Sequence, residues 1–328
     1  MKEEVSIRLI THSTDLPDLR CEDFFHSVSF FRILEDTPRQ KPCMAIATDG
    51  QGNIVGHLLA AISLHRSLLP PIMYSHCHVY GEGVYTPRTN DKEAIFAQLL
   101  KAVTEHCRHS LCLYIEFSDL SSKMFGYGKF RENGYFPIQW QKIHNSLHSM
   151  PPEERMAART LTKINNARQR GMTSIEAVVG SKEMSEAVAL MRRYFKLKPR
   201  RMVPDARFFN LLAESGNGRV FVTKYKEIIV GTCACLFFGG NAYLWHLAAR
   251  RKRYFTLAPA TFTMWAALEY AHKHGYRHMY FLDAGLPFKR SPMRELILNF
   301  GGKQVSEYRW FKIRLPWIGR LLDWRYNE

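Results

Sequence analysis

The expected secondary structure of this chain follows the same order twice, and this repetition limits the fold more than any single motif does. In each half a strand hairpin is followed by a helix, a buried strand, a loop with an Asn close to a Gly, and a last strand. About forty residues separate the start of the helix from that Asn in both halves. We therefore expect an α/β protein of the α+β kind that uses one architecture twice.

The first copy begins with two apolar runs on either side of Asp49-Gly50, a dipeptide that favours a hairpin turn. From Asp91 the spacing of the apolar residues changes from the strand period to the helix period, which predicts a helix. The loop of this copy contains Asn133-Gly134. Its expected strands cover 42–48, 54–64, 111–117 and 138–145.

The second copy follows Pro151-Pro152, which breaks the chain near its middle. A basic helix is expected over 153–171, where Gly171 stops it, and we interpret it as a linker helix. The other expected elements of this copy are helices over 182–195 and 259–274 and strands over 219–224, 228–238, 242–248, 276–283 and 303–313. A length of 328 residues suits two domains, which we place at 1–150 and 151–328.

Composition limits the compartment and the partners. The chain carries 46 Lys and Arg against 30 Asp and Glu, a formal net charge of +16, which attracts phosphorylated cofactors, nucleic acid or acidic membrane surfaces. Its seven cysteines form no paired Cys-x-x-Cys units, so neither a zinc ribbon nor a disulfide framework is indicated. The acidic N-terminus does not suit a signal peptide, and no run of about 18 apolar residues is present to span a bilayer. We expect a soluble, cytoplasmic protein.

Short segments in the second half carry a resemblance to a known family. They are 243–248, Ala258-Pro259 with Trp265 further along the same helix, and 281–285. With the order of elements, they resemble the GNAT acyltransferase fold. Two such domains in tandem, with a basic helix between them, resemble the FemABX-like transferases and related acetyltransferase-like proteins of bacteria. The resemblance covers most of the chain and implies two tandem GNAT-like domains, each with a mixed central sheet flanked by helices.

The loop 249–259 departs from the family pattern. GNAT enzymes that use coenzyme A usually carry Arg/Gln-x-x-Gly-x-Gly/Ala here, because those glycines let backbone N–H groups hold the pyrophosphate at the helix start. This loop has no glycine and four consecutive cations, so side-chain charge would attract the anion instead. The anion could be a CoA pyrophosphate, a tRNA phosphate or a lipid phosphate. The alternative is a basic loop that binds no ligand and is solvated. The residues expected to contact the donor are Trp245, Leu247, Arg250, Arg251, Arg253, Ala258 and Pro259.

The chemistry that the resemblance implies is attack of an amine on a thioester or ester carbonyl, which needs orientation, oxyanion stabilisation and a proton acceptor. The candidate proton acceptors are His246, because the histidine side chain ordinarily titrates near neutrality, and Asp283, which is expected to end a buried strand. A structural histidine and a turn-capping aspartate are the alternatives. Tyr254 is a candidate for protonating the leaving group. Glu82, between two glycines, is either an acceptor contact or an exposed turn carboxylate.

Other catalytic chemistries have less support, because the Gly-x-Ser-x-Gly and P-loop signatures are absent. His76 and His78 share one face of a strand and have metal-capable side chains, but no third and fourth ligand is apparent nearby. We therefore expect no metal.

The C-terminal segment 308–326 interleaves aromatic residues with arginines. One apolar surface, with Arg320 and Arg325 at its margins, is expected from Trp317, Ile318, Leu321, Leu322 and Trp324. Such a segment suits peripheral contact with an anionic membrane, here at the inner face, without crossing it. The alternative is a terminal strand and helix that pack on the domain.

The leading interpretation is a GNAT-fold N-acyltransferase that moves an acyl group from acyl-CoA to an amine of a small metabolite or cell-envelope precursor. The first alternative is a FemABX-like aminoacyl transferase that uses aminoacyl-tRNA. The second is a non-catalytic module that binds anionic lipid or nucleic acid.

Overall fold

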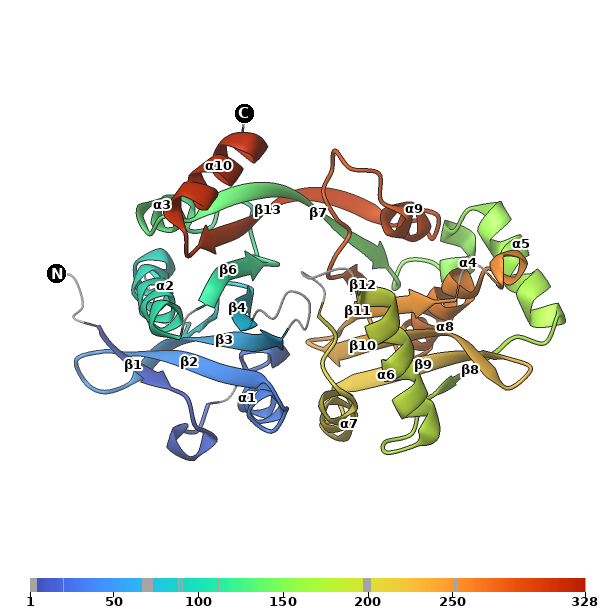
Figure 1. The fold of residues 1–328 in the computed structure, drawn as a ribbon, viewed down its shortest axis with the longest axis horizontal. Coiled ribbons are helices and arrows are strands. Elements are labelled where there is room, and N and C mark those ends of the chain that lie inside the picture. Colours follow the sequence, from blue (N-terminus) through green and yellow to red (C-terminus); the bar gives the residue numbers. More distant parts are fainter. Residues whose placement is uncertain are drawn as a thin grey trace. The chain divides into compact units, whose positions relative to one another are not determined.

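The computed structural model describes residues 5–19, 21–66, 73–87, 89, 91–110, 112–196, 202–250 and 253–327 (Figure 1). The chain folds into two compact units. Unit 1 consists of 1–140 together with 306–328, and unit 2 consists of 141–305.

The sheet of unit 1 has the order β1-β2-β3-β4-β6-β13, and within it β4 and β6 are parallel. Its strands are β1 (Ser6–Ile10), β2 (Gln40–Thr48), β3 (Ile54–Arg66), β4 (Met73–Tyr80), β5 (Val84–Tyr85), which pairs with β3, β6 (Cys112–Ser118) and most of β13 (Lys303–Ile313). Its helices are α1 (Val28–Glu35), α2 (Lys92–His109), α3 (Tyr127–Glu132) and α10 (Pro316–Asn327). The apolar face expected for α2 packs on the sheet, where Phe96, Leu99 and Val103 are fully buried.

The sheet of unit 2 has the order β7-β12-β11-β10-β9-β8, in which β11 and β12 are parallel. Its strands are β7 (Phe136–Ser146), β8 (Thr173–Glu176), β9 (Gly218–Tyr225), β10 (Ile228–Phe238), β11 (Asn241–Ala249) and β12 (His278–Phe281). Its helices are α4 (Pro152–Arg155), α5 (Ala158–Gln169), α6 (Lys182–Phe195), α7 (Ala206–Glu214), α8 (Pro259–Lys273) and α9 (Pro292–Leu298). Figure 1 shows α6 in front of β9–β11 and α8 behind them, so both faces of the sheet are covered. This explains why β10 is apolar along nearly its whole length.

The prediction of a single basic helix over 153–171 is wrong. The structure has α4 and α5 instead, separated at Met156, whose backbone is extended with φ −77° and ψ 154°. The Met156 side chain is buried, and the Ala157 N–H donates to the Asn299 carbonyl over 2.9 Å. Packing of this turn against the end of α9 therefore overrides helix propensity.

The two Asn-Gly loops that marked the repeat are ends of short helices. Asn133 is the C-cap of α3 and Asn299 is the C-cap of α9. A glycine with positive φ follows each cap, Gly134 at 74° and Gly301 at 81°. The repeated pattern is therefore a helix stop that turns the chain into the next strand.

The two units differ from the expected domains 1–150 and 151–328. The chain leaves unit 1 within β7 and re-enters it within β13, so the last strand and helix of the sequence complete the first unit. Antiparallel pairing with β6 places Trp310 opposite Phe117. Beside it, Arg309 Nη1 lies 2.8 Å from Glu116 Oε1, and these two side chains are 5% and 4% exposed. This buried ion pair fixes β13 to unit 1.

Breaking the Glu116–Arg309 pair is expected to destabilise the protein strongly. In the Arg309→Leu variant a buried carboxylate loses its charged partner, which costs about 3–5 kcal/mol of unfolding free energy. The Glu116→Leu/Arg309→Leu double variant removes both charges and is expected to lose much less. Urea unfolding followed by tryptophan fluorescence measures both, and equal losses in the two variants would contradict this account.

Unit 1 also buries four histidines in neutral form. Burial lowers the pKa of His26, His57 and His65 to about 4 and that of His76 to about 3. His26 Nδ1 accepts a hydrogen bond from the Leu59 N–H over 3.1 Å, and His65 and His76 share a hydrogen bond between their rings. These side chains therefore contribute to packing in their neutral form, and they become charged only at acidic pH.

Stability is expected to fall as the pH drops from about 6.5 to 4. The unfolded histidines, with pKa near 6.5, bind protons in this range while the folded ones do not, so protonation favours the unfolded state. His26 alone contributes a loss of about 3 kcal/mol at pH 4. Urea midpoints measured across this range should fall less steeply in His65→Phe/His76→Phe than in the exposed-site control His109→Gln. Parallel curves for the two variants would show that the buried histidines do not cause the pH dependence.

Candidate active site

The parallel strands β11 and β12 form an open fork in unit 2. They pair at three positions, of which the last joins Leu244 to Phe281, while β11 continues to Ala249. In unit 1 the parallel strands β4 and β6 stay paired from Ser75 to Tyr80. A fork of this kind, where a parallel ladder ends before one of its strands does, can admit a ligand beside the longer strand.

A β-bulge lies where the fork opens. Ala234 pairs with His246 and Cys235 with Leu244, so Trp245 is the extra residue of β11. Bulges bend a strand and redirect its side chains, and they are frequent beside active sites. Trp245 is half-buried against the Phe208 ring, with the two ring centroids 5.5 Å apart. Of the residues expected at the donor acyl group, Trp245 is thus the one that is partly exposed.

His246 and Leu247 lie deeper than Trp245. His246 is 6% exposed and packs edge-on against the rings of Phe195 and Phe209, with centroids 5.6 Å and 6.2 Å away. Leu247 is part of the apolar core that α8 covers.

Asp283 lies at the mouth of the fork. The preceding residue, Leu282, donates its N–H to the Leu244 carbonyl over 3.3 Å, just past the last residue pair of the two strands. Asp283 is half-buried between the buried residues Leu282 and Ala284. The sequence predicts a strand that reaches Asp283, whereas β12 ends two residues earlier, at Phe281.

The start of α8 is fixed tightly against the sheet. Ala258 has a left-handed backbone with φ 46°, and its carbonyl accepts from the Thr261 and Phe262 N–H groups over 2.9 and 3.2 Å. A Cβ on Gly231 would lie 2.1 Å from Thr263 Oγ1, so only glycine admits α8 this close. With Pro259 first in the helix and the next turn bonded internally, this end offers an anion little backbone donation.

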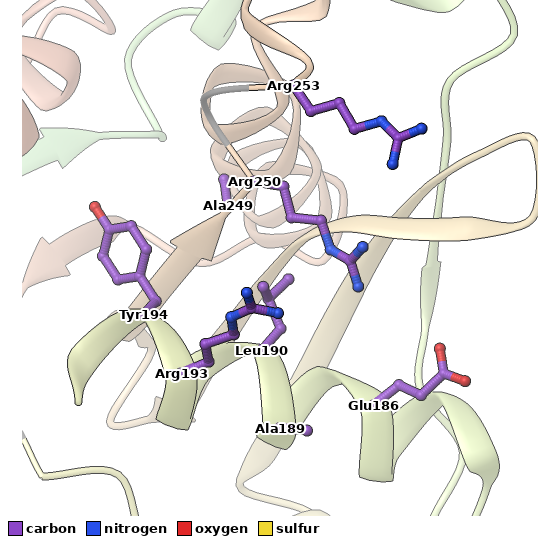
Figure 2. Close-up of a pocket in the computed structure, with 8 residues that line it drawn as sticks. All are labelled: Glu186, Ala189, Leu190, Arg193, Tyr194, Ala249, Arg250 and Arg253. Carbon is purple, nitrogen blue, oxygen red and sulfur yellow. The ribbon is translucent and has the colours of Figure 1, made fainter.

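Side chains supply the positive charge instead. A pocket of about 760 Å³ lies between α6 and the chain that leaves β11. Its lining residues are Glu186, Ala189, Leu190, Arg193, Tyr194, Ala249, Arg250 and Arg253. In Figure 2 the guanidinium groups of Arg193 and Arg250 face the same opening, from α6 and from the end of β11, and Arg253 extends above them. Three arginines against one glutamate make this pocket suited to a polyanion.

Arg193 and Tyr194 were not anticipated from the sequence. Glu186, Leu190 and Arg193 recur at helical spacing on α6, and the two long polar side chains among them were the available signal. Arg251, also expected in the pocket, lies outside the described residues.

Two other candidates do not line this pocket. Tyr254 packs near Tyr225, with ring centroids 6.2 Å apart, and lines a second pocket of about 410 Å³ that also includes Arg253. Glu82 belongs to unit 1, where its Oε2 accepts from the Ser121 N–H over 2.8 Å. Its carboxylate therefore ties two loops of unit 1 together.

The histidines considered as metal ligands have other hydrogen-bond partners. His76 is bonded to His65, and His78 Nε2 lies 2.9 Å from Ser118 Oγ. In the described ranges no three His, Cys, Asp or Glu side chains come together as a metal site would require.

Comparison with known proteins supports the fold described above. Residues 155–290 match the model of the acetyltransferase (GNAT) domain family. A tandem GNAT protein from the clavulanic acid biosynthesis pathway superimposes with a TM-score of 0.62 at 15% identity, covering 95% of this chain and 99% of that one. FemX gives 0.60 at 13% identity, with coverages of 92% and 94%. L-PGS from Bacillus licheniformis gives 0.57 at 13%, with 91% and 92%. A search of curated proteins gives no match.

These likenesses confirm the expected tandem fold, and the matched segment contains β11, the arginine-bearing loop, α8, β12 and Asp283. Residues 155–290 are therefore similar to a GNAT acetyltransferase domain, and the chain has the tandem GNAT fold.

Proposed function

We propose that unit 2 transfers an acyl group from acyl-CoA to an amine of a small metabolite or cell-envelope precursor. The observation that carries the proposal is the fork at Trp245 joined by β11 to the arginine pocket. A strand rises about 3.3 Å per residue, so about 16 Å of chain separates Trp245 from Arg250. That separation suits a donor with a long arm between its thioester and its phosphates, as coenzyme A has.

The separation between Trp245 and Arg250 also favours CoA over aminoacyl-tRNA. In aminoacyl-tRNA the acyl ester is on the terminal ribose, whose phosphate is only one sugar away. The similar clavulanic acid pathway protein was solved in a form described as being without AcCoA, which associates a CoA donor with that protein and supports this choice.

The proposed reaction needs one proton acceptor. The amine nitrogen attacks the thioester carbon, a C–N bond forms, the C–S bond breaks, the CoA thiolate leaves, and the nitrogen loses a proton. We assign this proton to Asp283, because it lies at the fork mouth and is only half-buried, whereas His246 is enclosed by aromatic rings. Glu82 as an acceptor contact and Tyr254 as a proton donor stay predictions.

The structure at the start of α8 favours a second candidate donor, aminoacyl-tRNA. Pro259 and the internal bonds to Ala258 leave no glycine-rich cradle for a pyrophosphate. The net charge of +16 suits a nucleic acid partner. The expected contact with an anionic membrane is made by the C-terminal segment of unit 1 and does not depend on this site.

Thermal shift titrations with CoA, acetyl-CoA and a long-chain acyl-CoA test the donor. A ligand at about 100 times its Kd should stabilise the protein by about 2.7 kcal/mol. Arg193→Gln/Arg250→Gln should weaken CoA binding more than tenfold, because each charged hydrogen bond contributes about 1.5–3 kcal/mol. Lys226→Gln, on a nearby turn, is the matched control.

The absence of a shift with all three ligands would overturn the CoA donor. Binding of tRNA that weakens steeply with salt would then favour the alternative, because many phosphates would be neutralised.

The Asp283→Asn variant is expected to lose about 100-fold or more in kcat/KM for the amine while keeping its CoA thermal shift. Glu214→Gln, an exposed carboxylate on α7, is the control. If His246→Gln rather than Asp283→Asn abolishes turnover, the proton acceptor is His246.

A further inference from the structure

Helix α10 presents an apolar stripe to solvent. Trp317, Leu321 and Trp324 are 62%, 53% and 57% exposed. They recur at spacings of four and three residues, which places them on one face of the helix. Single apolar residues scattered on a surface are normal, whereas two exposed tryptophans on one helical face form a contiguous patch that indicates an interaction site.

The other side of α10 faces unit 1. Gly319 lies against Ile313 and Phe136, at 3.9 and 4.0 Å from the position its Cβ would take. Asp323 Oδ2 accepts from Arg131 Nη1 of α3 over 2.9 Å. These contacts fix the rotation of the helix, so the stripe points outward.

Positive charge borders the stripe on both sides. At 3.6 residues per turn, Arg320 and Arg325 lie about 70° to either side of the centre of the stripe, and both are exposed. Two copies of this face would bring their arginines together, which costs free energy, in a chain of net charge +16. An anionic lipid surface offers charge for the arginines and an interface for the tryptophans.

We propose that α10 docks unit 1 on anionic lipid bilayers, with its axis in the plane of the interface. The helix has 12 residues and is about 18 Å long, shorter than the hydrocarbon core of about 30 Å. Nor does any other helix in the described part of the chain have the length and apolarity to cross a bilayer. The docking is independent of the donor and acceptor proposed for unit 2.

Cosedimentation of the full chain with vesicles tests the docking. Vesicles of phosphatidylcholine with about 30% phosphatidylglycerol should bind the protein, and pure phosphatidylcholine should bind at least tenfold less. Arg320→Gln/Arg325→Gln should weaken binding about 25-fold, or about fivefold per arginine. Trp317→Ser/Leu321→Ser/Trp324→Ser should weaken it at least tenfold and abolish a blue shift of tryptophan emission. Met124→Ser/Val178→Ser, at residues 58% and 71% exposed, is the matched control and should bind as the natural sequence does.

Three results would overturn the proposal. The first is no binding to the anionic vesicles. The second is unchanged binding of the Ser variant, which would make the attraction purely electrostatic. The third is self-association, seen by sedimentation velocity, that the Ser variant abolishes, because the stripe would then be a contact between copies. Equal melting temperatures of the variants establish that folding is not the cause of any loss.

Discussion

The hydrogen-bonded pairing of β11 with β12 ends after three residue pairs, and the candidate site depends on this early end. Past Leu244 and Phe281 the ladder between the two strands ends while β11 continues to Ala249, and Asp283 lies two residues after the end of β12. The bulge at Trp245 belongs to the same irregularity, because an extra residue bends the strand away from regular pairing. In unit 1 the parallel strands remain paired to their ends, so the duplicated architecture is open in one copy and closed in the other.

The start of α8 shows how one small residue decides which groups meet an anion. Gly231 lets Thr263 approach the sheet, and Thr263 Oγ1 bonds to Thr223 Oγ1 at 2.7 Å and to the Pro259 carbonyl at 2.8 Å. The helix start is thereby rigid and its first turn is occupied with its own hydrogen bonds. Charge reaches the pocket on long arginine side chains, which adapt to ligands of different shape more readily than a backbone cradle does.

Much of the fold follows from local patterns in the sequence. The bounds expected for α6, β10 and β13 agree with the structure at the residue level, because each combines a clear period with a turn or cap at its ends. The break at Met156 could not be read locally, since it depends on a contact with Asn299, far along the chain. The fork and bulge were also hidden, because they depend on register between strands. Arg250 and Arg253 were found from their run of charge, whereas Arg193 required knowing which face of α6 borders the pocket.

The return of the chain into unit 1 through β13 has a consequence for synthesis on the ribosome. Residues 1–140 emerge first but lack the strand that covers β6 and the arginine that neutralises Glu116. At about 5–20 residues per second, translation of 141–305 takes about 10–30 s. Unit 2, which is continuous in sequence, can fold during that interval, so the second unit to be translated is the first that can be completed. The uncovered edge of the first is then exposed to chaperones, or to another nascent chain, until its last strand arrives.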